Sequence, residues 1–176
     1  MNEYKSLEYG YVILSPDGNP KYVEITVKSI RRIYDDAKII CVIQDGVVRE
    51  NEEEIMGICD VLRGEGTYTS LITKGMQNPT SEWNIIIIAG NIVTKRIQDK
   101  YSYFVEDERD ILFPVVDRKW NFVDGTINGI LFHRNANSEI GDFPRLDSLQ
   151  ECKIAWASLA MEMGYRFKAI VGARLS

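Results

Sequence analysis

A run of four β-branched residues, Ile85–Ile88, constrains the fold of this chain more than any other feature. Such a run is typical of a strand that is buried on both faces, as in the middle of a parallel sheet. In open α/β sheets, ligands bind just beyond the carboxyl ends of the strands. The run therefore predicts that Ala89–Asn91, which follows it directly, forms one lip of a binding cleft. These three positions contain no Asp or Glu, so the carboxylates that usually bind a metal ion after such a strand are missing.

The other apolar segments alternate between strand-like and helix-like patterns. Further strands are expected at residues 11–14, 38–43, 67–71, 111–116, 126–133 and 168–171. Helices are expected at residues 23–34, 52–62, 72–77, 94–100 and 149–163, the fourth as a polar helix or a loop. The alternation predicts an α/β fold with a mostly parallel central sheet flanked by helices, in which 111–116 and 126–133 pair partly antiparallel. We find no repeat or linker, so one domain is expected over residues 1–176.

In a parallel sheet the carboxyl ends of neighbouring strands lie at one edge. The first strand, the second strand and the Ile-rich strand would therefore bring three loops around one crevice. These loops are Ser15–Asn19, Gln44–Gly46 and Ala89–Asn91. The sequence predicts a ligand site between them.

Composition narrows the classes of function. The net charge is −5 and the Lys and Arg residues are scattered, which argues against nucleic acid as a partner because phosphate neutralisation needs a basic face. No segment reaches membrane-spanning length and no secretion signal is visible, so a soluble, cytoplasmic protein is expected. Its three cysteines are expected to be reduced and packed in the core. The single histidine, His133, excludes three-histidine metal sites.

Motifs of several large enzyme classes are absent. No G-x-G-x-x-G follows a strand, and neither a phosphate-binding loop motif nor G-x-S-x-G occurs. These absences argue against a dinucleotide-dependent dehydrogenase, a P-loop nucleotidase and an α/β-hydrolase.

Short motifs in a fixed order along the chain carry a resemblance to a known family. They are Gln44–Gly46 at the end of the second strand, Ile72–Met76 followed by Thr80–Trp83, Asn128–Arg134 followed by Gly141–Phe143, and Met163–Tyr165 after the last helix. In order and spacing these motifs resemble those of family 2 glycosyltransferases with the GT-A fold. The resemblance covers roughly residues 10 to 172.

This resemblance implies a GT-A-like domain that takes a nucleotide-sugar as a small-molecule substrate and transfers the sugar to an acceptor, which is unknown. It implies that Asp45 contacts the nucleoside, although a plain turn residue before Gly46 is an equal alternative. A donor diphosphate would need cations, each of which is also typical of a solvated surface. The cations best placed for this role are Lys74, Lys95, Arg96 and Arg134.

The chain departs from the family at the metal motif. The family's Asp-x-Asp binds a divalent cation, Mn²⁺ or Mg²⁺, which acts as a Lewis acid for the departing phosphate. Ala89 and Asn91 occupy these positions here, and one amide oxygen of Asn91 would not hold the ion well alone. The metal ligands are therefore unknown. The acidic run at residues 106–110 reads as a solvated loop or as an ion site that has moved.

The second departure concerns the catalytic base. The family places an acidic pair at the start of the final helix, where one carboxylate deprotonates the acceptor hydroxyl. This chain offers only Glu151 there, and Ser148–Glu151 is also a good capping box. Asp142, which precedes that helix, is the other candidate for the base.

Two alternatives to a sugar transferase stay open at this point. One is a relative that kept the sheet and lost the chemistry, and now serves as a binding or interaction protein. The other is an unrelated flavodoxin-like domain. An acceptor pocket would have to come from the loops at residues 117–125 and 135–146, or from a partner chain in an oligomer.

Overall fold

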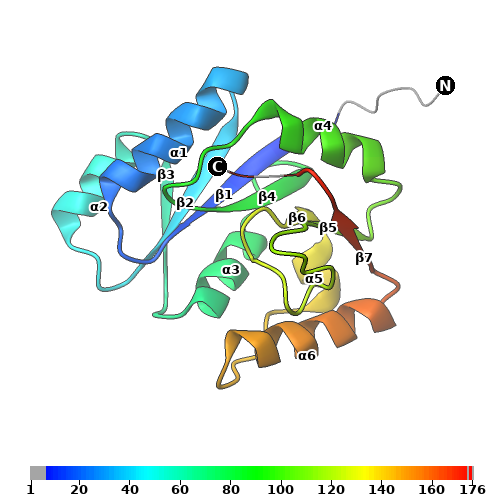
Figure 1. Ribbon diagram of the computed structural model, residues 1–176. Coiled ribbons are helices and arrows are strands. Elements are labelled where there is room, and N and C mark those ends of the chain that lie inside the picture. The colour runs from blue at the N-terminus through cyan, green and yellow to red at the C-terminus, as the bar shows by residue number, and fades with distance from the viewer. Residues whose placement is uncertain (1–6, 174, 176) are drawn as a thin grey trace.

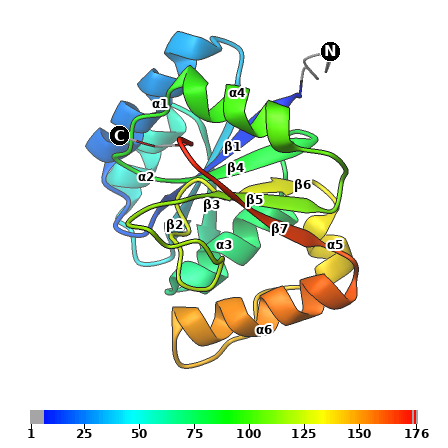
Figure 2. The same ribbon diagram turned by 45° about the vertical axis from the view of Figure 1, so that its right-hand side comes forward.

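The structure is a computed structural model that describes residues 7–173 and 175. Its strands join into one seven-stranded sheet in the order β3-β2-β1-β4-β6-β5-β7, which Figures 1 and 2 show from two sides. The strands are β1 (Tyr9–Ser15), β2 (Lys38–Gln44), β3 (Asp60–Gly64), β4 (Trp83–Ile88), β5 (Asp110–Pro114), β6 (Leu131–His133) and β7 (Arg166–Ile170). The predicted α/β class with a mostly parallel sheet is confirmed.

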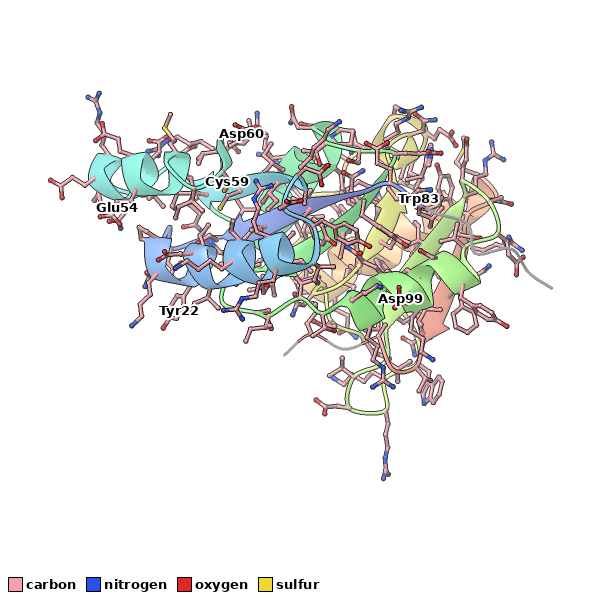
Figure 3. All side chains as sticks on the ribbon, turned by 90° about the horizontal axis from the view of Figure 1, so that it is seen from above. Tyr22, Glu54, Cys59, Asp60, Trp83 and Asp99 are labelled. Atoms are coloured by element: carbon pink, nitrogen blue, oxygen red, sulfur yellow. The ribbon has the colours of Figure 1, made fainter. Side chains whose placement is uncertain are left out.

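Helices cover both faces of this sheet. They are α1 (Pro20–Ile33), α2 (Arg49–Met56), α3 (Tyr68–Gln77), α4 (Lys95–Phe104), α5 (Ala136–Ile140) and α6 (Leu149–Glu162). The helices α1, α2 and α4 pack on one face, and α3, α5 and α6 pack on the other. Figure 3 looks onto the first face, with Tyr22 on α1, Glu54 on α2 and Asp99 on α4. No helix among the described residues is both long and apolar enough to span a bilayer.

The central strands explain why the sheet forms in this order. β1 lies between β2 and β4 and runs parallel to both, with Val12 opposite Ile40 on one side and Ile86 on the other. Tyr11–Leu14 and Ile85–Ile87 are almost completely buried. Apolar side chains on both faces of the sheet are therefore removed from contact with water. The ends of β1, β2 and β4 therefore lie at one edge, as the sequence predicts.

Local signals fix the ends of the long helices. The Asn19 side chain accepts a hydrogen bond from the Lys21 N–H, and Pro20 occupies the first turn of α1. The Ser148 hydroxyl accepts the Glu151 N–H at the start of α6, at a distance of 3.1 Å. Gly164 follows α6 with φ of +85°, the left-handed conformation expected after a helix end. The predicted helix at 149–163 is confirmed.

Two predictions between β2 and β4 are wrong. The predicted helix at 52–62 ends at Met56, because Val61 and Leu62 pair with β2 in strand β3. Strand pairing outweighs the helical spacing of the apolar residues. The predicted strand at 67–71 is the first half of α3, whose Thr67 side chain accepts the Ser70 N–H. That capping signal was available in the sequence.

The part of the sheet formed by β6, β5 and β7 is only partly as predicted. β6 pairs antiparallel with both β4 and β5, which confirms a mixed sheet at 111–133. However, β6 is three residues long rather than the predicted span of 126–133. β7 pairs parallel with β5 and closes the sheet, as expected. The short helix α5 was not predicted.

A buried carboxylate ties the edge strand β7 to the start of β5. Asp110 is fully buried and accepts the N–H groups of Glu106 and Asp107, at 2.7 and 3.2 Å. It also accepts Lys168 Nζ at 3.0 Å and Arg166 Nε at 3.2 Å, both from β7. Burial alone would raise the pKa of the Asp110 carboxyl, but these hydrogen bonds and the Lys168 charge outweigh it and hold the pKa below its usual value.

We expect Asp110→Asn to lower the free energy of unfolding at pH 7 by about 1–3 kcal/mol, because the buried network loses its negative charge and one of its two acceptor oxygens. A lowered folded-state pKa stabilises the fold above the unfolded-state pKa of about 3.9, and this contribution disappears as pH falls through the folded-state value. The difference between the two proteins should therefore shrink below about pH 4. Urea unfolding at pH 7 and pH 3 measures it. Asp99→Asn, on the exposed side of α4, is the control. A difference that is equal at both pH values would contradict this assignment.

Candidate functional site

A cavity of about 380 Å³ extends along α3 from the carboxyl ends of β2 and β3 to Gln77, the last residue of the helix. Its walls are the ends of these strands, one side of α3 and the loop between α5 and α6. This volume lies in the range of small-molecule sites, about 300–1,000 Å³. The lining residues are Asp45, Arg63, Gly64, Glu65, Thr69, Ser70, Thr73, Lys74, Gln77, Asp142, Phe143 and Arg145.

The strand wall of the cavity is held by Arg63 on β3. Its guanidinium donates to the Asp45 carbonyl at 2.7 Å and to the Val47 carbonyl at 3.1 Å, and it pairs with the Glu52 carboxylate. These contacts fasten the turn after β2 to the end of β3. As a result, the backbone that carries the exposed Asp45 side chain is fixed at the rim of the cavity.

The helix wall is polar and regularly spaced. Thr69, Thr73 and Gln77 follow one another at intervals of four residues on α3, so they share one side of the helix. Lys74 lies in the last turn beside them, and no ion pair joins it to a carboxylate of the described residues. The wall therefore offers hydroxyl and amide groups together with one ammonium group.

The loop wall carries Asp142. Its Oδ1 accepts a hydrogen bond from Gln77 Nε2 at 3.0 Å and another from Asn137 Nδ2 at 3.1 Å. Next to it, the Phe143 N–H donates to the Thr73 hydroxyl at 3.3 Å. The Phe143 ring stacks on Trp156 of α6 with 4.5 Å between centroids. The loop is therefore anchored both to α3 and to the apolar core.

An ion pair spans the cavity between the strand wall and the loop wall. Arg145 Nη2 lies 2.9 Å from Glu65 Oε2, and both side chains are largely exposed, at 78% and 68%. Exposed pairs of this kind contribute little to stability, typically under about 1 kcal/mol. Arg145 can therefore exchange its partner for another anion at small cost.

The structure brings together three of the residues that the sequence singles out. Asp45, Lys74 and Asp142 line the same cavity although they come from three separate segments. Asn91, Arg96, Arg134 and Glu151 lie outside it.

The turn after β4 is occupied by contacts to α1. The Gly90 N–H donates to the Thr26 hydroxyl at 2.9 Å, and that hydroxyl donates to the Asn91 carbonyl at 2.8 Å. The Asn91 side-chain amide donates back to the Ile88 carbonyl at 2.9 Å. Ala89 adds no ligand atom, so this turn presents a single amide oxygen. These residues do not fit a tightly held divalent cation, which prefers several carboxylate oxygens.

Three predicted residues lie away from the cavity for identifiable reasons. Arg134 follows β6, and its N–H donates to the Glu82 carbonyl at 2.8 Å. Because β6 is antiparallel, Arg134 is at the amino edge of the parallel strands, and it does not line the cavity. Arg96 lies in the first turn of α4 beside Gly172. The Glu151 N–H is bonded to Ser148, which favours the capping interpretation.

Sequence reasoning missed Arg145 and the hydroxyl groups of α3. Arg145 belongs to a loop without periodicity, and only its tertiary position gives it a role. Thr69 and Thr73 could have been found, because Thr67 at a helix cap followed by polar residues at intervals of four predicts a polar helix side. The mistaken strand at 67–71 hid that pattern.

No protein-family model and no curated protein sequence matches the chain. Solved structures do match, at 8–14% identity for the three described next.

The mannosyltransferase PcManGT from Pyrobaculum calidifontis, solved with GDP-Man and Mn²⁺, has a TM-score of 0.65 at 14% identity, over 95% of this chain and 57% of that one. TarS from S. aureus, solved with UDP, has a TM-score of 0.58 at 11% identity, over 93% and 57%. Glucosyl-3-phosphoglycerate synthase from Mycobacterium tuberculosis, solved with Mn²⁺, UDP and phosphoglyceric acid, has a TM-score of 0.67 at 8% identity, over 97% and 70%. The chain therefore has the GT-A-like fold of nucleotide-sugar transferases, and it spans little more than half the length of the first two.

Proposed function

We propose that the chain binds a nucleotide-sugar in the cavity beside α3 and transfers the sugar to an acceptor hydroxyl without a metal at the turn after β4. The observation that carries this proposal is the meeting of Asp45, Lys74 and Asp142 in one cavity at the carboxyl edge of a GT-A-like sheet. The structural neighbours, which were solved with UDP or GDP-Man, support the donor class.

Asp45 is suited to the nucleoside part of the donor. It stands at the end of β2 on a turn that Arg63 holds in place. A carboxylate accepts two hydrogen bonds, which matches a pair of ribose hydroxyls or the N–H groups of a base. Charged acceptors form the stronger class of hydrogen bond, so this contact would fix the orientation of the donor.

Two cations are suited to the diphosphate. Lys74 is free of a described ion-pair partner, and Arg145 is paired only with the exposed Glu65. Together they supply two positive charges to the negative charge that grows on the departing diphosphate. In this proposal the two side chains neutralise the departing diphosphate, because the Ala89–Asn91 turn has no carboxylate to hold a metal ion for that purpose.

Asp142 is suited to the role of general base. In the proposed step its carboxylate takes the proton of the acceptor hydroxyl, and the acceptor oxygen forms a bond to the anomeric carbon. The bond between that carbon and the diphosphate oxygen breaks at the same time, with inversion. The hydrogen bonds from Gln77 and Asn137 reach one carboxylate oxygen, which leaves the other for the acceptor.

A binding protein without transfer activity is the second candidate. It is favoured by the loss of both metal-site carboxylates at Ala89 and Asn91, and by the position of Glu151 outside the cavity. In this case the nucleotide-sugar would bind and no sugar would be transferred. For the transferase, the acceptor pocket would come from the loops at 117–125 and 135–146 or from a partner chain. For either candidate, a reducing compartment such as the cytoplasm would suit the three free cysteines.

Lys74→Ala should weaken the binding of UDP or GDP at least tenfold, because the diphosphate loses a direct charge partner. Lys74→Arg should keep most of the affinity. Isothermal titration of UDP, GDP, UDP-sugars and GDP-sugars, with and without Mn²⁺, measures the effect. Lys28→Ala removes an exposed lysine of α1 that pairs with Glu24, and it serves as the matched control. No binding by the wild type across this panel would refute the donor site.

Asp142→Asn should lower the transfer rate by about 10²–10⁴-fold, the usual contribution of a general base. The asparagine oxygen still accepts from Gln77 and Asn137, so the loop geometry and the donor affinity should be kept. Release of the nucleotide during transfer measures turnover, and titration measures affinity. Glu151→Gln is the control and should retain activity. If Glu151→Gln is inactive and Asp142→Asn is active, the assignment of the base is wrong.

A further inference from the structure

A second cluster of ionisable side chains lies at the amino edge of the sheet. Glu82 precedes β4, Glu108 precedes β5 and His133 ends β6. Because β6 runs antiparallel to its neighbours, its last residue reaches the edge where β4 and β5 begin. None of these three residues lines the cavity, so the cluster is separate from the proposed donor site.

His133 is the central member of the cluster. Its side chain is 1% exposed, and its Nε2 has no hydrogen-bond partner among the described residues. Glu82 Oε1 lies 3.6 Å away and Glu108 Oε1 lies 3.9 Å away. The Trp83 ring packs edge-to-face against the imidazole, with 5.1 Å between the ring centroids. A buried polar atom without a partner is rare in folded proteins and indicates an interaction still to be made.

We propose that Glu82, Glu108 and His133 form a binding site for a divalent transition-metal ion, with Zn²⁺ as the best-suited ion. The three ligand atoms lie within 4.8 Å of one another. Ligands at about 2.0–2.2 Å from a tetrahedral zinc ion lie roughly 3.4 Å apart, so small side-chain rotations close the site. The two carboxylates are partly exposed, at 46% and 66%, and are free to rotate.

The chemistry of the ligand set selects the ion. An imidazole nitrogen favours zinc and other transition metals over Mg²⁺ and Ca²⁺, which prefer oxygen ligands alone. Two carboxylates neutralise the double positive charge of the ion. Three protein ligands leave the fourth coordination position to water. Because the ligands come from three segments, the ion would also join the starts of β4 and β5 to the end of β6.

The hydrogen bond at the other ring nitrogen shows what the ion has to displace. The Asn135 N–H donates to His133 Nδ1 at 3.2 Å, so the neutral imidazole carries its proton on Nε2. Metal binding at Nε2 removes the proton from that atom. A neutral ring then carries its proton on Nδ1, which can no longer accept the hydrogen bond from the Asn135 N–H. The competing state is an Nε2–H that donates to Glu82 or Glu108 after a small shift. The experiment has to separate these two states.

Titration of Zn²⁺ into protein stripped of metal by EDTA tests the site, with calorimetry for affinity and thermal unfolding for stability. We expect one ion per chain, with release of protons and a rise in Tm. The Glu82→Gln and Glu108→Gln variants should each bind at least tenfold more weakly, because each loses a charged ligand. Both side chains are exposed, so these variants should fold. Glu54→Gln, on α2 at the far end of the molecule from Trp83 in Figure 3, should bind as the wild type does.

Co²⁺ provides a spectroscopic measurement of the same site. Its visible absorption should appear in the wild type and disappear in the Glu82→Gln, Glu108→Gln double variant. Binding of Zn²⁺ by the double variant with wild-type affinity would overturn the proposal, as would absence of binding by the wild type. Binding of UDP by the double variant is measured in parallel, and it should be unchanged because neither Glu82 nor Glu108 lines the donor cavity.

Discussion

The parallel pairing of β1 between β2 and β4 is the constraint on which the rest of the structure depends. These strands are buried on both faces, so their backbone groups satisfy one another and their side chains supply two separate cores. Because the three strands point the same way, the segments that leave them lie at one edge. Helices on both faces follow from the parallel connections, since each crossover has to pass over the sheet.

The candidate site uses only part of that edge. Contacts from Thr26 of α1 hold the turn after β4, and the open cavity lies on the α3 side, beside β2 and β3. This displacement explains why Asp45 contributes to the cavity and Asn91 does not. A site built here depends on side chains of α3 and of the loop before α6, and these include the cations that the proposed chemistry needs.

The sequence predicts well those elements whose signals are local. The apolar run at 85–88 and the Ser148 cap each identify their element correctly, because burial and capping act within a few residues. Leu62 was misplaced because its strand forms only when β2 is beside it. The position of Arg134 could not be read from the sequence, because the direction of β6 is a tertiary property. Asp142 could be chosen from the family resemblance, but its neighbours Gln77 and Asn137 could not.

Because aromatic residues anchor the Asp142 loop, the proposed site is built from two parts of the chain. Phe143 stacks on Trp156, which packs in turn against Phe122 and Phe167, so the loop that carries this carboxylate is packed against α6 and β7 as well as hydrogen-bonded to α3. Asp45 and Lys74 belong instead to the segment before β4. The distance between the proposed donor-binding groups and the proposed base is therefore set by how the early and late parts of the chain pack together. Substitutions deep in the late aromatic core, remote from any ligand, would therefore shift the proposed base and Arg145 of the same loop relative to Asp45 and Lys74.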